Sequence, residues 1–141
     1  MTRKAFELAE EIKDVRAACY DARNLANIYS EKKDRIQQEH FYQKGLEYSQ
    51  SLNDPAEQLI DYRNLGNFYM ERGYREKAGA FFEQAFEISK SRGDKKALAE
   101  DYRNRGNLSF SNGDRQQAEE HYRQALKLTQ EVGDLVGAAQ D

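Results

Sequence analysis

A short polar motif recurs three times along this chain of 141 residues, at intervals of 40. Each copy reads Arg-Asn-x-x-Asn, and the nine residues are Arg23, Asn24, Asn27, Arg63, Asn64, Asn67, Arg103, Asn104 and Asn107. The Arg and the second Asn are four residues apart, so they share one face if the segment is helical. An Asn amide can donate to and accept from a peptide backbone together, and Arg pairs with carboxylates in bidentate geometry. The motif therefore predicts a surface that binds an extended or partly helical acidic peptide.

The same side chains also have a purely structural interpretation. Asp21, Asp61 and Asp101 each stand two residues before an Arg of the motif. Each Arg could pair with an Asp of an adjacent repeat, and each Asn could hydrogen-bond between helices. Asn is a poor helix former, so its recurrence inside helices needs one reason or the other. From the residues alone, both interpretations remain open.

The motif belongs to a longer internal repeat. Asp21, Asp61, Asp101 and Asp141 are spaced by 40, and segments 61–100 and 101–140 share 14 identical positions out of 40. Unrelated segments would share about two or three at average residue usage. The sequence therefore predicts one domain over 1–141, made of a half repeat at 1–20 and full periods at 21–60, 61–100 and 101–140.

Within each period the apolar residues recur at helical spacing, and Gly-Asp pairs separate the helical segments. Gly113 suits the left-handed residue after a helix end, and Asp114 suits the next N-cap. Gly93-Asp94 and Gly133-Asp134 repeat this signal. We therefore expect seven helices, near residues 3–13, 15–32, 35–51, 55–72, 75–91, 95–111 and 115–131, with a new helix starting at Asp134.

The pattern of large and small residues resembles the tetratricopeptide repeat, in a longer form similar to LGN/Pins-type and bacterial arrays. The residues that carry the resemblance are Tyr62, Leu65, Gly66, Tyr69, Ala78, Phe82 and Ala85. The resemblance implies an all-α, right-handed α-solenoid of antiparallel helix pairs, with about 3.5 repeats. It also implies a non-enzymatic protein-binding scaffold, in which the first helix of each pair, with the nine motif residues, lines a concave groove.

Composition and motif content argue against several other classes of function. The net charge of −3 gives no general attraction to nucleic acid or to anionic membranes, and the Arg residues of the motif are all that favours nucleic acid. No apolar run approaches the roughly 20 residues of a membrane span. Phosphate-binding glycine motifs and metal-ligand spacings are absent from the sequence. We therefore expect a cytoplasmic protein that binds a protein or peptide partner. We expect no enzymatic activity, cofactor or metal, and no binding of nucleic acid or membranes.

Self-assembly is the alternative function. The half repeats at the two ends would leave apolar edges uncovered, whereas repeat arrays normally end in polar caps. The residues concerned are Ala5, Phe6, Leu8, Ile12, Leu128, Val132, Leu135 and Val136. Such edges predict a homo-oligomer, or a fragment of a longer array whose ends pair.

Overall fold

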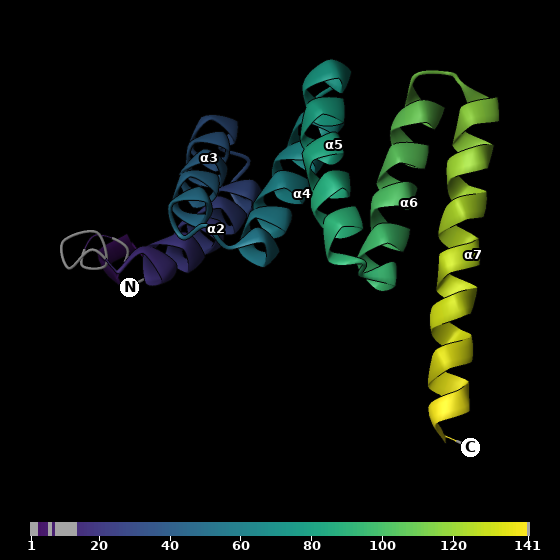
Figure 1. Ribbon diagram of the computed structural model, residues 1–141. Helices are drawn as coiled ribbons and strands as arrows, with labels where there is room; N and C mark the ends of the chain where they lie inside the picture. The colour runs from purple at the N-terminus through teal and green to yellow at the C-terminus, as the bar shows by residue number, and fades with distance from the viewer. Residues whose placement is uncertain (1–2, 6, 8–13, 141) are drawn as a thin grey trace. The chain divides into compact units, whose positions relative to one another are not determined.

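The structure is a computed structural model that describes residues 3–5, 7 and 14–140, with side-chain surroundings up to residue 133. The residues it describes form helices and tight turns, without strands (Figure 1). The bounds of the helices are α2 Val15–Glu31, α3 Arg35–Ser51, α4 Pro55–Glu71, α5 Arg75–Arg92, α6 Lys95–Ser111 and α7 Arg115–Gln140. Helices α2, α4 and α6 begin 40 residues apart, as do α3, α5 and α7. The expected helix at 3–13 lies largely outside the described residues, although residues 3–5 and 7 are helical.

Aspartates begin four of the helices, and the sequence predicts this for Asp94 and Asp114. The carboxylates of Asp14, Asp34, Asp94 and Asp114 each accept a hydrogen bond, 3.0–3.2 Å long, from the backbone N–H three residues later. Each such contact satisfies one of the N–H groups that a helix leaves without a partner in its first turn. The periodic aspartates therefore fix where four helices start.

Residues with positive φ end the helices. Gly73, Gly93 and Gly113 have φ between 64° and 85°, and the turn after α3 uses Asn53 with φ 52°. This confirms the predicted roles of Gly93 and Gly113. The turn after α2 uses Lys33 with φ 60°, which the sequence did not indicate because Lys seldom adopts this conformation.

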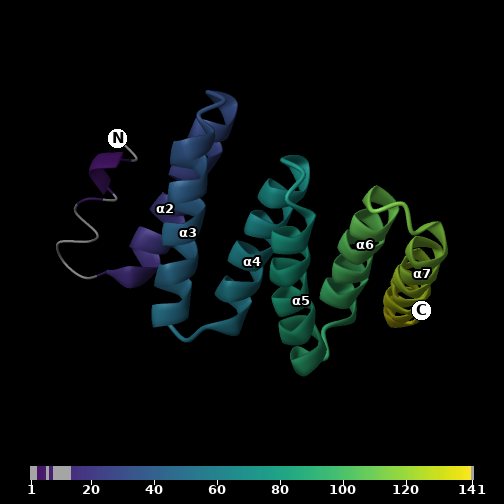
Figure 2. The same cartoon turned by 90° about the horizontal axis from the view of Figure 1, so that it is seen from above.

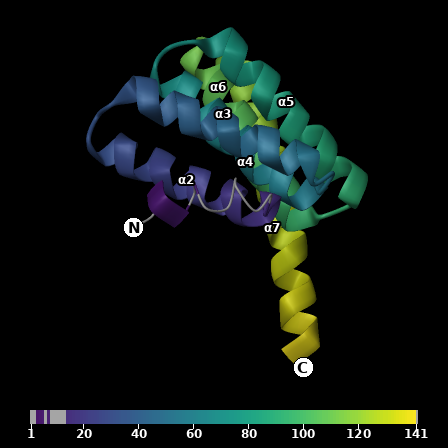
Figure 3. The ribbon, with the colours of Figure 1, turned by 90° about the vertical axis from the view of Figure 1, so that its left-hand side faces the viewer.

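The predicted turn at Gly133-Asp134 is wrong. Helix α7 continues through Gly133 to Gln140 as a single helix, which Figure 3 shows projecting at its C-terminal end (Figure 3). Glycine permits a left-handed turn but does not require one, and inside a helix it costs only about 1 kcal/mol relative to Ala. At Gly93 and Gly113 the chain turns into another helix, whereas no described helix follows α7. Local helix propensity therefore decides the conformation here.

The chain divides into two compact units, residues 1–68 and 69–141, with the boundary inside α4. In the first unit α2 and α3 pack side by side and are joined by the tight turn at residues 32–34 (Figure 2). Tyr29 stacks on Phe41 with ring centroids 5.7 Å apart. Tyr42 of α3 meets Phe68 of α4 edge to face at 6.1 Å. The core of this unit is completed by Ala18, Cys19, Ala22, Leu25, Ala26, Leu59 and Leu65.

In the second unit α6 packs against both α5 and α7. Phe82 and Phe86 of α5 are buried, and Phe86 meets Tyr102 of α6 edge to face at 5.1 Å. Gly106 lies so close to α7 that a Cβ atom there would be 2.7 Å from the ring of Tyr122. The absence of a side chain at Gly106 therefore lets α7 approach α6 closely.

Candidate functional site

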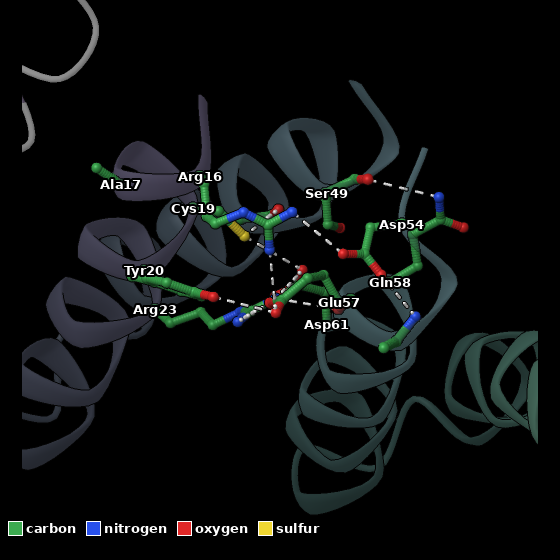
Figure 4. A network of polar contacts seen from close by, with 12 residues as sticks. Arg16, Ala17, Cys19, Tyr20, Arg23, Ser49, Asp54, Glu57, Gln58 and Asp61 are labelled. Carbon is green, nitrogen blue, oxygen red and sulfur yellow. Dashed lines mark hydrogen bonds and ion pairs between the residues drawn. The ribbon is translucent and has the colours of Figure 1, made fainter. Parts of the chain in front are cut away.

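Arg23, the first Arg of the motif, is engaged in a salt-bridge cluster between α2 and α4 (Figure 4). Its Nε and Nη2 donate to the two carboxylate oxygens of Asp61, each at 2.8 Å. Its Nη1 donates to Glu57 at 2.7 Å, and Nη2 also donates to the Glu57 backbone carbonyl at 3.0 Å. The Arg23 side chain is 11% exposed and that of Asp61 is fully buried. For Arg23 the structure thus shows the ion pair with an Asp of the next repeat.

The surroundings of this cluster keep the Cys19 thiol protonated and the Arg23 guanidinium charged. Burial raises the pKa of the Cys19 thiol to about 12, and the negative charge of Asp61 adds to this effect. The Cys19 thiol donates to the backbone carbonyl of Gly45 at 3.4 Å. Burial alone would lower the pKa of Arg23, but its contacts with Asp61 and Glu57 outweigh burial and raise that pKa. The cluster is therefore a stable charged contact that holds α4 on α2.

Two of the motif asparagines share a second contact. Tyr42 donates its hydroxyl to Oδ1 of Asn27 at 3.2 Å, and Tyr122 donates to Oδ1 of Asn107 at 2.5 Å. Both tyrosines stand 15 residues after their asparagine, so the contact joins the two helices of one repeat. The tyrosine occupies the amide oxygen, which leaves the NH₂ group as the part that can donate to a ligand. Both asparagines remain exposed.

The other motif residues differ in exposure. Asn24 and Asn67 are exposed, whereas Arg63, Asn64 and Asn104 are half-buried.

Arg103 is exposed and donates to the hydroxyl of Thr129 at 2.8 Å. It lines a small crevice of about 250 Å³ between α6 and α7, together with Asn107, Tyr122 and Leu126. The structure therefore brings Arg103 and Asn107 together at one crevice, as the shared helical face predicts.

Sequence reasoning missed two acidic contacts. Glu57 completes the Arg23 cluster, and its position four residues before Asp61 was the available signal, because the two share one helical face. Asp101 is buried and accepts a hydrogen bond from the hydroxyl of Ser89. Ser49 and Ser89 are both buried and stand 40 residues apart. The recurrence of this serine in the repeat was the available signal for the second contact.

Several other expectations concern residues that the structure describes only in part. In the described part of the chain no three His, Cys, Asp or Glu side chains form a group that could hold a metal ion. None of the described helices has the length and apolarity that a membrane crossing requires. Of the apolar edge residues, Ala5 is exposed, and Leu128 and Val132 are half-buried. Phe6, Leu8 and Ile12, and the side chains of Leu135 and Val136, lie outside what the structure describes, so self-assembly through them stays a prediction.

Comparisons with solved structures show the fold. BtubC (BKLC) from P. vanneervenii superposes with a TM-score of 0.78 and 24% identity over 94% of this chain, which spans 56% of the length of BtubC. The TPR domain of Arabidopsis FLU superposes with a TM-score of 0.73 and 19% identity, covering 82% of this chain and 98% of that domain. No curated protein matches the chain.

The sequence itself gives the family. The profile of the tetratricopeptide repeat matches residues 58–131, which is more than half of the chain. This match covers all of the second full period and most of the third, and the all-helical fold of the solved relatives agrees with it. The chain therefore belongs to the tetratricopeptide repeat family.

Proposed function

We propose that this protein is a scaffold that binds an extended, acidic peptide through the exposed amides of α2, α4 and α6. Membership of the tetratricopeptide repeat family indicates a protein–protein interaction scaffold. The finer proposal, an acidic peptide on the motif residues, is supported by their chemistry and their exposure.

The observation that carries the proposal is a recurring exposed asparagine. Asn27, Asn67 and Asn107 occupy the same position in successive repeats, and all three are exposed. Each costs roughly half a kcal/mol relative to Ala in a helix interior. The tyrosine contacts of Asn27 and Asn107 use only the amide oxygen, so the exposed NH₂ groups favour a role in ligand binding as well. An exposed Asn amide suits a peptide backbone, because it can bond the main chain without reading a side chain.

The arginines give the surface its preference for acidic ligands. Arg103 is exposed, and within the described part of the chain it bonds a hydroxyl and not a carboxylate. It can therefore form a charge-assisted pair with a ligand carboxylate. Arg23 is left out of the proposed surface because Glu57 and Asp61 already use its guanidinium.

A binding experiment with matched amide variants tests this proposal. The probe is a fluorescein-labelled peptide of alternating Asp and Ser residues, compared by anisotropy with an Asn and Ser analogue. We expect the parent protein to prefer the acidic peptide, and Asn24→Ala with Asn67→Ala to weaken its binding about tenfold, because each lost hydrogen bond contributes roughly 0.5–1.5 kcal/mol. Neither Asn24 nor Asn67 makes a side-chain hydrogen bond to another described residue, so the fold should be kept.

The matched control removes two amides elsewhere. Gln124 and Gln130 are exposed on α7. Gln124→Ala with Gln130→Ala should leave the affinity unchanged. If the asparagine variant binds the acidic peptide as tightly as the parent does, with an unchanged circular dichroism spectrum, the proposal is wrong.

A further inference from the structure

An apolar face is exposed where α6 and α7 lie side by side. It consists of Arg103 and Phe110 on α6 and of Tyr122 and Leu126 on α7, and we call it the end face. Phe110 and Leu126 are both more than half exposed, at 57% and 58%, and Tyr122 is 38% exposed. A groove of about 680 Å³ runs between Phe110, Tyr122 and Leu126. Exposed large apolar side chains that adjoin one another in a groove indicate a binding surface.

The same positions are covered by a helix elsewhere in the chain. Phe82 and Phe86 stand 40 residues before Tyr122 and Leu126, yet they are only 2% and 8% exposed. Helix α6 covers them, with Tyr102 against Phe86. In the first unit, Tyr42 holds the same position as Tyr122, and Phe68 of α4 covers it. At two positions that are equivalent to the end face in other repeats, the surface is thus covered by a helix.

The first unit also shows which charges such a helix carries. Arg23 of α2 holds Glu57 and Asp61 of α4, which lie four residues apart on the covering helix. Arg103 stands 80 residues after Arg23, so it has the same place in its repeat. Among the described residues Arg103 has the Thr129 hydroxyl as its partner, and no carboxylate within salt-bridge distance. Within the residues whose side chains the structure describes, the end face therefore has the basic residue of this contact but lacks the acidic pair.

We infer that the end face binds an amphipathic helix of a partner protein, in which two acidic residues four positions apart contact Arg103. Apolar residues about two turns further along that helix cover Tyr122 and Leu126, as Phe68, seven residues after Asp61, covers Tyr42. A second copy of this chain fits less well, because the acidic pair of its own α4 is already held by Arg23. This inference goes beyond the proposed peptide function, since it concerns a helix and an apolar face.

The test uses a synthetic peptide with the sequence of residues 54–72, acetylated and amidated, added to the intact protein. Binding is followed by fluorescence anisotropy. We expect Leu126→Glu to weaken binding by more than about tenfold, because it places a charge at the centre of the apolar groove. Arg103→Glu should weaken binding by about tenfold, because it sets like charges against each other. Lys127→Glu is the matched control, since Lys127 is exposed on α7 outside the groove, and it should leave the affinity unchanged.

A charge exchange distinguishes a direct contact from a general loss of structure. A peptide with Lys in place of both acidic residues should bind the parent protein weakly and should regain affinity for the Arg103→Glu variant. No such recovery, or equal binding to the parent and Leu126→Glu proteins, would overturn the inference. Concentration-dependent dimers that Leu126→Glu abolishes would also overturn it, because the occupant would then be a second copy.

The failure of this inference can be told apart from that of the proposed function. Asn24→Ala with Asn67→Ala should not change binding of the helical peptide. Phe110→Ala removes an apolar side chain of the groove but none of the crevice that holds Arg103 and Asn107. It should therefore weaken binding of the helical peptide and leave binding of the extended acidic peptide unchanged.

Discussion

Replacing Arg23 with Ala is expected to lower the free energy of unfolding by about 3–5 kcal/mol. The substitution removes the guanidinium that bonds both oxygens of Asp61, whose side chain is fully buried. A buried carboxylate without its partner lowers the stability of the folded state, because it has lost its hydration and no cation replaces the lost water. Urea denaturation followed by circular dichroism at 222 nm measures the change.

Arg16 provides the matched control on the same helix. It pairs with Asp54 at 3.2 Å and with Glu57 at 3.6 Å, but its side chain is 48% exposed. Exposed ion pairs contribute little, so Arg16→Ala should shift the urea midpoint far less than Arg23→Ala does. A double substitution of Arg23 and Asp61 by Leu should be less harmful than Arg23→Ala, because it removes the fully buried carboxylate together with its partner, and Glu57 keeps its contact with Arg16. Equal effects of Arg16→Ala and Arg23→Ala would contradict the structural role given to the cluster.

Replacing Phe82 with Ala should also cost about 3–5 kcal/mol in the free energy of unfolding. Phe82 is almost fully buried in the second unit, and with Leu108 and Arg105 of α6 it lines a crevice between these helices. Truncation of its ring leaves a cavity that the surrounding helices can fill only in part. Thermal and urea unfolding of the variant give the measurement.

Tyr122 supplies the comparison for Phe82, because it has the same place in the next repeat but is exposed on the end face. Tyr122→Ala loses the hydrogen bond to Asn107 and part of a ring that solvent already reaches. Its cost should be clearly smaller than that of Phe82→Ala. If the two variants lost the same stability, the end face would not be the uncovered surface that the structure describes.

Much of the fold could be predicted from the sequence, because the signals are local. The predicted bounds of α2 to α6 agree with the structure within one residue. Asp at helix starts and Gly or Asn at helix ends account for most of them, whereas the turn after α2 uses Lys33 and α5 follows Tyr74. The end of α7 could not be predicted from Gly133, because a glycine only permits a turn. Whether the chain turns there depends on a packing partner, which is not a local property.

The candidate site could be predicted only in part. Spacing placed Arg103 and Asn107 on one helical face, and both line one crevice. Spacing could not decide whether Arg23 faces solvent or a neighbouring helix, because that depends on how α4 packs on α2. The tyrosine contacts of Asn27 and Asn107 could have been predicted from the sequence, because Tyr42 and Tyr122 are separated by the same interval as the two asparagines.

The most direct test of the central claim, that the asparagines of α2, α4 and α6 bind a peptide, is a nuclear magnetic resonance titration. The ¹⁵N-labelled protein is titrated with the unlabelled Asp and Ser peptide, and the side-chain NH₂ resonances of its asparagines and glutamines are followed. We predict saturable shifts for Asn24, Asn27, Asn67 and Asn107, with Gln124 and Gln130 unmoved. Saturable binding that moves the glutamine resonances, or other surfaces, and leaves these four asparagines in place would contradict the account.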